Sequence, residues 1–200
     1  MTTPASRTAT VERATRETSI TLALNLDGSA NVAVATGIGF LDHLLTALAT
    51  HARWDLSLQC KGDLHVDDHH TAEDCALALG AAIDQALGHR RAFARFGEAH
   101  APLDEALARA VVDVSSRPHA EIRLDLRRPM IGALACENIA HVLRSLAVAA
   151  RFTLHVDVLR GENDHHKAEA AFKATALALR RALARDVGSS DVPSTKGVLA

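Results

Sequence analysis

The segments "DDHHTAED" (residues 67–74) and "NDHHKAEA" (residues 163–170) share the pattern Asp-His-His-x-x-Glu. Each copy leads into an apolar run with the spacing of an amphipathic helix. One copy alone is weak evidence, because a lone HHxxE is more often a solvated helix start than a set of metal ligands. Two copies in a chain of 200 residues indicate a repeated fold with metal-seeking side chains at matching places.

The segments around the two copies follow the same order of predicted elements. In the first half, alternating apolar residues on both sides of Asp27-Gly28 favour a β-hairpin. After it we predict a helix at 37–52, a strand at 54–66 and a helix at 70–88 that ends at Gly88. In the second half we predict two strands within 104–126 that join near Ser116-Arg117-Pro118, a helix at 137–152, a strand at 153–159 and a helix at 165–186. The sequence therefore predicts an α+β fold of two ββαβα units related by a pseudo-twofold axis, each with a sheet backed by helices.

We predict a single domain over residues 1–200, with repeat halves at about 10–90 and 100–187 and a loop-like tail at 188–200. Hydrophobic residues make up 48% of the chain, which is enough to bury a core. The net charge of −2 gives no field that would favour nucleic acid or a membrane surface. The N-terminus lacks the apolar core of a secretion signal, and three separated cysteines argue against a disulfide framework. We therefore expect a cytoplasmic protein.

Helix geometry divides the candidate ligands between two metal ions. Residues i and i+4 lie on one face of a helix and can hold one ion together. Two such pairs are present, His69 with Glu73 and His165 with Glu169. The second histidine of each doublet, His70 or His166, points about 100° away and suits a different ion. The simplest closed arrangement exchanges these second histidines between the repeats.

Two further histidines occupy matching places in the repeats. His43 and His141 each lie early in the first helix of a unit and can add one imidazole to each site. Three His and one Glu would complete a tetrahedral zinc site, or leave two open positions on an octahedral ion such as Mn²⁺. Spacing does not decide between the two. Asp68 and Asp164 would either orient an imidazole N–H or cap the following helices.

The chain resembles the imidazoleglycerol-phosphate dehydratase family of histidine biosynthesis. The resemblance runs from about Arg13 to Leu199. Its motifs, in the family's order, are "RATRET", "GIGFLDHLL", "KGDLHVDDHHTAED", "RFGEAHAPLDEALARA", "SSRPH", "NDHHKAEAAFKA" and "PSTKGVL". The chain departs from the family at Thr46-Ala47, where Asp-Gln is usual, so a substrate contact through that Gln is not carried over. At this length the resemblance implies the monofunctional form, without the phosphatase domain that is fused to some bacterial relatives.

The resemblance implies the duplicated fold, a homo-oligomer of 24 subunits and two manganese ions per subunit at subunit contacts. The first manganese would take His43, His70, His165 and Glu169, and the second His69, Glu73, His141 and His166. These sets agree with the exchange deduced from helix geometry. That the ligands come from different subunits is implied by the resemblance alone.

The resemblance also gives roles to residues around the metals. Glu17 would be a substrate-contacting acid–base group, and Glu73 and Glu169 are further catalytic candidates. Arg95, Arg117 and Lys196 would clamp the substrate phosphate, because Arg offers a planar fork and Lys a point charge. The implied substrate-binding set is Glu17, His43, His51, His69, Glu73, Arg95, Arg117, His165, Glu169, Thr195, Lys196 and Gly197.

The implied reaction is dehydration of D-erythro-imidazoleglycerol phosphate to imidazole-acetol phosphate. The hydrogen that is lost does not neighbour a carbonyl, so direct abstraction has no electron sink. If each ring nitrogen binds one metal, the ring can lose its N–H, and the imidazolate can expel the hydroxyl through a diazafulvene-like intermediate. The residues alone also leave open a two-metal phosphoester hydrolase and a metal-storage assembly without catalysis. The reaction products would distinguish the three.

Overall fold

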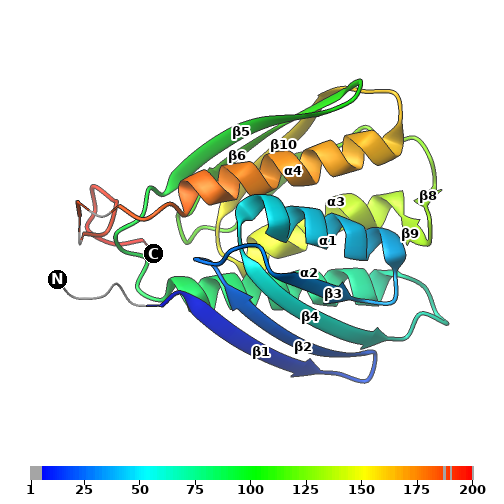
Figure 1. The fold of residues 1–200 in the computed structure, drawn as a ribbon, viewed down its shortest axis with the longest axis horizontal. Coiled ribbons are helices and arrows are strands. Elements are labelled where there is room, and N and C mark those ends of the chain that lie inside the picture. The colour runs from blue at the N-terminus through cyan, green and yellow to red at the C-terminus, as the bar shows by residue number, and fades with distance from the viewer. Residues whose placement is uncertain (1–5, 187, 190, 200) are drawn as a thin grey trace.

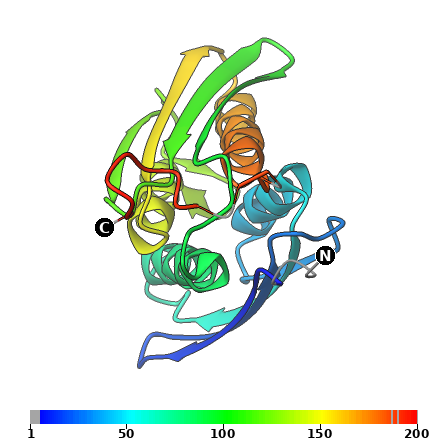
Figure 2. The ribbon, with the colours of Figure 1, turned by 90° about the vertical axis from the view of Figure 1, so that its left-hand side faces the viewer.

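The computed structural model describes residues 6–186, 188–189 and 191–199. Two four-stranded sheets form the outer layers, and four helices lie between them (Figure 1). Figure 2 shows the helices end-on within this layer. Residues 1–5, 187, 190 and 200 lie outside the described residues. The predicted second repeat ends at residue 187, and residues 190 and 200 belong to the predicted tail. None of the helices in the described part of the chain is long and apolar enough to span a membrane.

The two halves of the chain have the same elements in the same order. The first half contains β1 (Thr8–Ala14), β2 (Thr18–Asn25), β3 (Val32–Ala35), α1 (Gly39–Ala52), β4 (Asp55–Gly62) and α2 (His69–Leu87). The second contains β5 (Phe96–Leu103), β6 (Ala106–Asp113), β7 (His119–Arg123), α3 (Cys136–Ala149), β10 (Thr153–Arg160) and α4 (Asp164–Ala182). A short hairpin of β8 (Met130–Ile131) and β9 (Leu134–Ala135) precedes α3.

The sheet orders are β1-β2-β4-β3 and β5-β6-β10-β7, which match strand for strand. The helices match as well, since α1 and α3 have 14 residues each and α2 and α4 have 19 each. The predicted α+β class, with sheets backed by helices, is confirmed. Each four-stranded sheet has one strand more than the predicted ββαβα order, because β1 and β5 add an edge strand to each sheet. The β8–β9 hairpin of the second unit was not predicted either.

The hairpin predicted across Asp27-Gly28 is wrong in its pairing. The chain turns there, but β4 inserts between β2 and β3, antiparallel to the first and parallel to the second. Asp55, at the start of β4, holds this junction. Its carboxylate accepts the backbone N–H of Ser29 and of Asn31, at 2.8 and 3.0 Å, and the side-chain amide of Asn25 at 3.2 Å.

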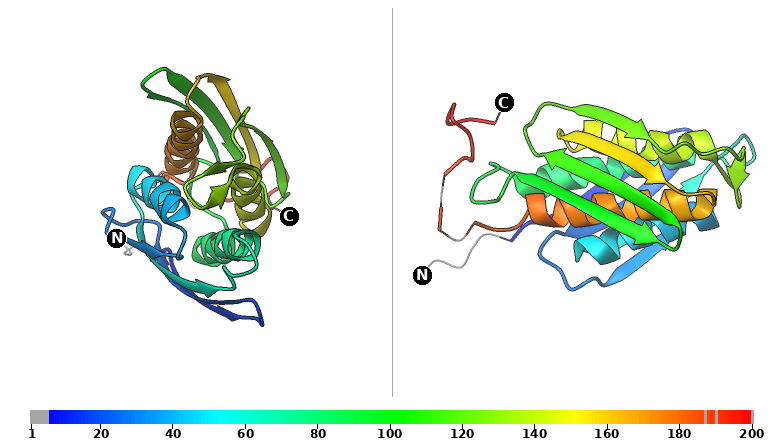
Figure 3. Two further views of the ribbon diagram at one scale, coloured as in Figure 1. Left: turned by 90° about the vertical axis from the view of Figure 1, so that its right-hand side faces the viewer. Right: turned by 90° about the horizontal axis from the view of Figure 1, so that it is seen from above.

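All four helices begin at the end of the molecule that carries β8 and β9, and the C-terminal tail lies at the opposite end (Figures 1 and 3). Small residues let the helices approach closely. A Cβ on Gly80 of α2 would lie only 2.6 Å from the Cβ of Ala149 in α3. The contact of α2 with α3, and that of α1 with α4, join the two repeats into one core. The N-termini of four helices, with their partial positive charges, therefore meet at one end.

Asp27, in the turn after β2, ties together the two ends of the folded chain. It pairs with Arg7 before β1 and with Arg185 after α4. Arg7 Nη1 also donates to the carbonyl of Leu183 at 2.6 Å. Burial would raise the pKa of Asp27, but the hydrogen bonds from Arg7 and Arg185 lower it to about 2.

We expect Asp27→Asn to lower the free energy of unfolding by about 1 kcal/mol at pH 7, because the carboxylate is partly exposed and its ion pairs are screened. The folded-state pKa is lowered, so this stability is present above pH ~4 and is lost as the pH falls toward about 2. Urea unfolding at a series of pH values measures the difference between wild type and variant. Glu121→Gln, which removes an exposed pair with Arg123, is the control and should change little. A difference for Asp27→Asn that stays constant between pH 7 and pH 2 would contradict the linkage.

Candidate metal centre and substrate-binding residues

The first group of candidate ligands consists of His43, His165 and Glu169. Glu169 Oε2 lies 2.9 Å from His43 Nε2 and 3.3 Å from His165 Nε2. The His165–Glu169 pair is the predicted i, i+4 pair at the start of α4, whereas His43 comes from the first turns of α1. The three side chains are close enough to share one ion.

The second group consists of His69, Glu73 and His141. Glu73 Oε1 lies 3.1 Å from His141 Nε2, and Glu73 Oε2 lies 4.0 Å from His69 Nε2. The rings of His69 and His141 stack with their centroids 5.0 Å apart. His69 and Glu73 begin α2, and His141 lies on α3. Each group therefore joins one doublet helix to the first helix of the other repeat.

The second histidine of each doublet lies outside both groups. His70 Nδ1 contacts Asp63 Oδ2 at 3.0 Å, and His166 Nδ1 contacts Glu105 Oε2 at 2.7 Å. These hydrogen bonds raise the pKa of His70 and of His166, although desolvation opposes the shift. Within one chain, the predicted four-ligand sets are therefore three-ligand sets, and their assignment to metals stays a prediction.

Several imidazoles are oriented in the way that metal ligands require. A ligating histidine usually binds through one nitrogen while its other ring N–H is held by an acceptor. The Nδ1 atoms of His70 and His166 contact carboxylates, and that of His69 contacts Asn138 Oδ1 at 3.0 Å. Their Nε2 atoms are thus the ones directed to bind. Imidazole and carboxylate donors in such groups fit a divalent transition metal.

Asp63, Glu105 and Asn138 were not found from the sequence. They lie in separate segments. Glu105 stands in the turn between β5 and β6, the place that Glu17 has in the turn between β1 and β2. The backbone N–H of Asn163, the His166 ring and the backbone N–H of Glu162 lower the pKa of Glu105 to about 2. Glu105 therefore stays a carboxylate and an acceptor for His166.

Lys173 is a further residue that the sequence did not single out. It lies one turn after Glu169 on α4, and its Nζ is 2.7 Å from Glu169 Oε1. Burial would raise the pKa of Glu169, but the contacts with Lys173 and His43 lower it to about 2. His51, in the last turn of α1, has a lowered pKa because of burial and the nearby charge of Lys173.

Neither Asp68 nor Asp164 orients an imidazole, and only Asp68 stands at an N-cap position, that of α2, where its side chain makes no capping hydrogen bond. Asp68 Oδ2 accepts the backbone N–H of Ala135 at 2.7 Å. Asp164 Oδ2 accepts those of Arg127 and Arg128, at 2.8 and 2.7 Å. Both carboxylates therefore fasten the segment between β7 and α3 to the ends of the doublet helices. The residue that caps α4 is Asn163, whose side chain accepts from His165 N.

Glu17 lies in the tight turn between β1 and β2, close to His70. Its Oε1 is 3.8 Å from His70 Nε2, and its side chain is half exposed. Thr15 Oγ1 shapes the turn by accepting the backbone N–H groups of Glu17 and Thr18. The predicted acid–base residue thus stands beside the histidine that is missing from the ligand groups of its own chain.

The predicted phosphate-binding residues lie far from the doublets of their own chain. Arg95 N donates to the carbonyl of Ala182, the last residue of α4. The doublet begins the same helix, so its 19 residues separate the two ends by roughly 27 Å. Arg117 lies near Arg95, since both approach Asp113. Pro193, in the tail that carries Thr195, Lys196 and Gly197, accepts from Arg95 Nη1 at 2.8 Å.

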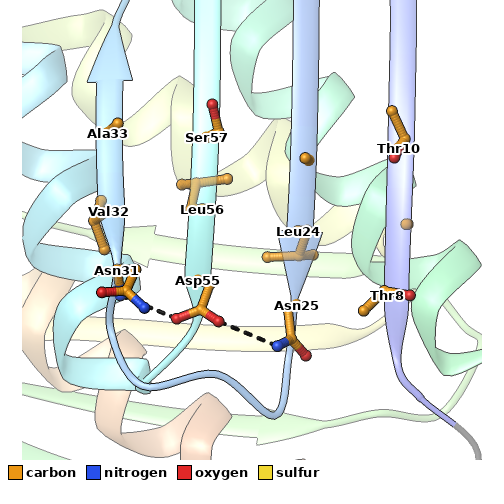
Figure 4. Close-up of a pocket in the computed structure, with 12 residues that line it drawn as sticks. Thr8, Thr10, Leu24, Asn25, Asn31, Val32, Ala33, Asp55, Leu56 and Ser57 are labelled. Atoms are coloured by element: carbon orange, nitrogen blue, oxygen red, sulfur yellow. Dashed lines mark hydrogen bonds between the residues drawn. The ribbon is translucent and has the colours of Figure 1, made fainter.

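A groove on the first sheet is unrelated to these residues. It has a volume of about 600 Å³ and lies on the solvent face of the first sheet, around Thr10, Ala23, Ala33 and Ser57 (Figure 4). None of the predicted metal or substrate residues lines it. Its wall is a shallow strip of small side chains, with Asp55 and its two Asn partners at one end.

Comparison with known proteins identifies the family. Residues 36–179 match the family model described as imidazoleglycerol-phosphate dehydratase. An imidazoleglycerol-phosphate dehydratase of Phytophthora nicotianae is 62% identical over 97% of this chain, which spans 43% of that longer relative. That of Kluyveromyces lactis is 52% identical over 96% of this chain and 97% of its own length.

Solved structures agree. The imidazoleglycerol-phosphate dehydratase of Staphylococcus aureus has a TM-score of 0.81 and 32% identity, covering 89% of this chain and 98% of its own. The enzyme of Pyrococcus furiosus, solved in complex with (S)-C348, has a TM-score of 0.79 and 35% identity, over 94% of this chain and 100% of its own. The repeated sheets, the two groups of His and Glu side chains and these relatives lead to one conclusion: the chain belongs to the imidazoleglycerol-phosphate dehydratase family of hydro-lyases in histidine biosynthesis.

Proposed function

We propose that the chain dehydrates D-erythro-imidazoleglycerol phosphate to imidazole-acetol phosphate at paired manganese sites that are completed between subunits. The observation that carries the proposal is the pair of His–His–Glu groups, each of which has three ligands within 4.8 Å of one another. A hydrolase that used two metals would release inorganic phosphate instead. A product assay with the purified protein therefore tests the reaction, and free phosphate in place of the keto phosphate would defeat it.

The residues that would hold the metals follow from the two groups. His43, His165 and Glu169 would bind one ion and His69, Glu73 and His141 the other, with His70 and His166 supplied by other copies of the chain. The position of the two remaining histidines supports this exchange, because each lies outside both groups and has its Nδ1 held by a carboxylate, which leaves Nε2 for an ion. Four protein ligands leave two positions of an octahedral Mn²⁺ for substrate.

When bound, the two cations would favour loss of the ring N–H of an imidazole placed between them, which supplies the electron sink that the reaction needs. Glu17 then has the chemistry of the acid–base group: its carboxylate is half exposed and stands beside His70. It would move a proton at the carbon next to the departing hydroxyl. Arg95, Arg117 and Lys196 would hold the phosphate by charge-assisted hydrogen bonds and so orient the ring.

Removal of an exchanged histidine should break the assembly without unfolding the chain. We expect His70→Ala to keep its helical content but to bind manganese on the order of tenfold or more weakly, because one of four ligands is lost. Light scattering should also show a smaller particle. His65→Ala, in the loop that leads into α2, is the matched control and should leave metal content and particle size unchanged. A His70→Ala particle of wild-type size with about two manganese ions per chain would contradict the exchange.

Glu17→Gln should separate binding from turnover. Glutamine keeps the shape of the side chain but cannot take up a proton, so we expect kcat to fall on the order of 10²-fold or more. Metal content and the KM for substrate should change little. Steady-state kinetics and elemental analysis of the same preparation measure both. Glu12→Gln, on the adjoining strand β1, is the control; a kcat for Glu17→Gln equal to that of the control would remove Glu17 from the chemistry.

A further inference from the structure

Arg95 and Arg117, which the proposed function assigns to the substrate phosphate, share one carboxylate. Arg95 Nε and Nη2 donate to the two oxygens of Asp113, at 2.7 and 3.1 Å. Arg117 Nη2 lies 3.8 Å from Asp113 Oδ2. The two arginines reach this point from different segments, one after α2 and the other after β6. Asp113 is thus their common neighbour.

The backbone of Asp113 is held in place by its sheet. It ends β6, which is an inner strand of its sheet, and it is paired with Phe96 of β5 on one side and Thr153 of β10 on the other. Its backbone is therefore held on both edges, and its short side chain has only two torsions. The side chain of Arg117, by contrast, is 59% exposed and has no such constraint of its own.

The backbone of Arg95 has a left-handed conformation, which hydrogen bonds to neighbouring segments stabilise. Its φ is +73°, a left-handed value that costs an L-residue with a side chain roughly 1–2 kcal/mol. Its N–H donates to Ala182 O at 2.8 Å, and its carbonyl accepts from Val114 N at 3.0 Å. The residue before Arg117, Ser116, has a φ of +64°. Both arginine-bearing segments thus keep strained turns, which is typical of sites where geometry matters.

The hydrogen bonds of Arg95 leave part of its guanidinium available. Of five N–H donors, two go to Asp113 and one goes from Nη1 to Pro193 O, at 2.8 Å. The remaining two have no partner among the described residues. The carboxylate therefore fixes the plane of the guanidinium, and the tail is held beside it. A phosphate oxygen would meet donors that are already oriented.

The charge of Asp113 also explains how two guanidiniums can stay close together without an anion between them. Two like charges repel at short range, and a carboxylate that contacts both offsets this repulsion. The two arginines and Asp113 keep a net charge of +1. A phosphate dianion is therefore still attracted, although one carboxylate lies at the site.

We propose that Asp113 is a positioning residue of the phosphate subsite: it holds Arg95 and Arg117 in the arrangement in which both face one phosphate group. The inference rests on the proposed function, which supplies the role of the two arginines. Asp113 does not touch the substrate. Its loss should therefore weaken phosphate binding more than it slows the chemical step.

Asp113→Asn tests this inference against a matched control. Asp157 of β10 pairs with Arg109 of β6 at 2.8 Å, so Asp157→Asn removes an Asp–Arg pair from the same sheet. For Asp113→Asn we expect KM to rise about tenfold or more and kcat to change less than about threefold, because charge-assisted contacts to phosphate are lost. The inhibition constant of inorganic phosphate should rise by a similar factor. Asp157→Asn should change neither, and Asp113→Glu should recover part of the affinity.

A second measurement needs no turnover. Inorganic phosphate should raise the thermal midpoint of the wild type and of Asp157→Asn, and should raise that of Asp113→Asn much less. Unchanged phosphate effects in Asp113→Asn, or equal losses in both variants, would overturn the role of Asp113. A wild type that binds phosphate in this way but does not dehydrate the substrate would defeat the proposed function and leave the positioning role standing.

Discussion

Each glutamate of the two candidate ligand groups contacts one histidine of its own helix and another from the other half of the chain. Glu169 of α4 meets His43 of α1, and Glu73 of α2 meets His141 of α3. The packing of the helices makes these two crossed contacts possible. They require α1 to pack on α4 and α2 on α3, which small residues such as Gly80 allow, and they require all four helices to begin at one end. The sheets then lie outside, where they cover the helices without entering the site.

The sequence predicted the helices well and the sheets only in part. The helices carry a 3.6-residue pattern of apolar side chains, so their ends differ from the prediction by a few residues. β5 turns mainly small residues inward, Gly97, Ala99 and Ala101, because α4 lies directly against it, and such a strand has little hydrophobic alternation. The pairing of β2 and β3 with β4 depends on Asp55, whose partners are distant in sequence, so a local turn signal could not reveal it.

The candidate site was likewise predicted only in part. The doublets and their i, i+4 glutamates follow from spacing, and matching positions in the repeats add His43 and His141. Asp63, Glu105 and Asn138, which orient the imidazoles, have no periodic signal, because each comes from a loop or helix that only the folded chain brings near. The sequence also did not predict that the arginines and the doublets are separated by the full length of α4. Under the proposed function, one chain would therefore present two different ends of a substrate site.

Because of the crossed contacts, neither half of the chain has a complete ligand group by itself. A half-length chain with only α1 and α2 would hold the His69–Glu73 pair, but it would lack His141, which completes that group. Two identical halves related by a twofold axis would complete both groups at once, as the matched strand orders and helix lengths of the present halves imply. The two halves of the present chain thus have the arrangement that a homodimer of such half-chains would have.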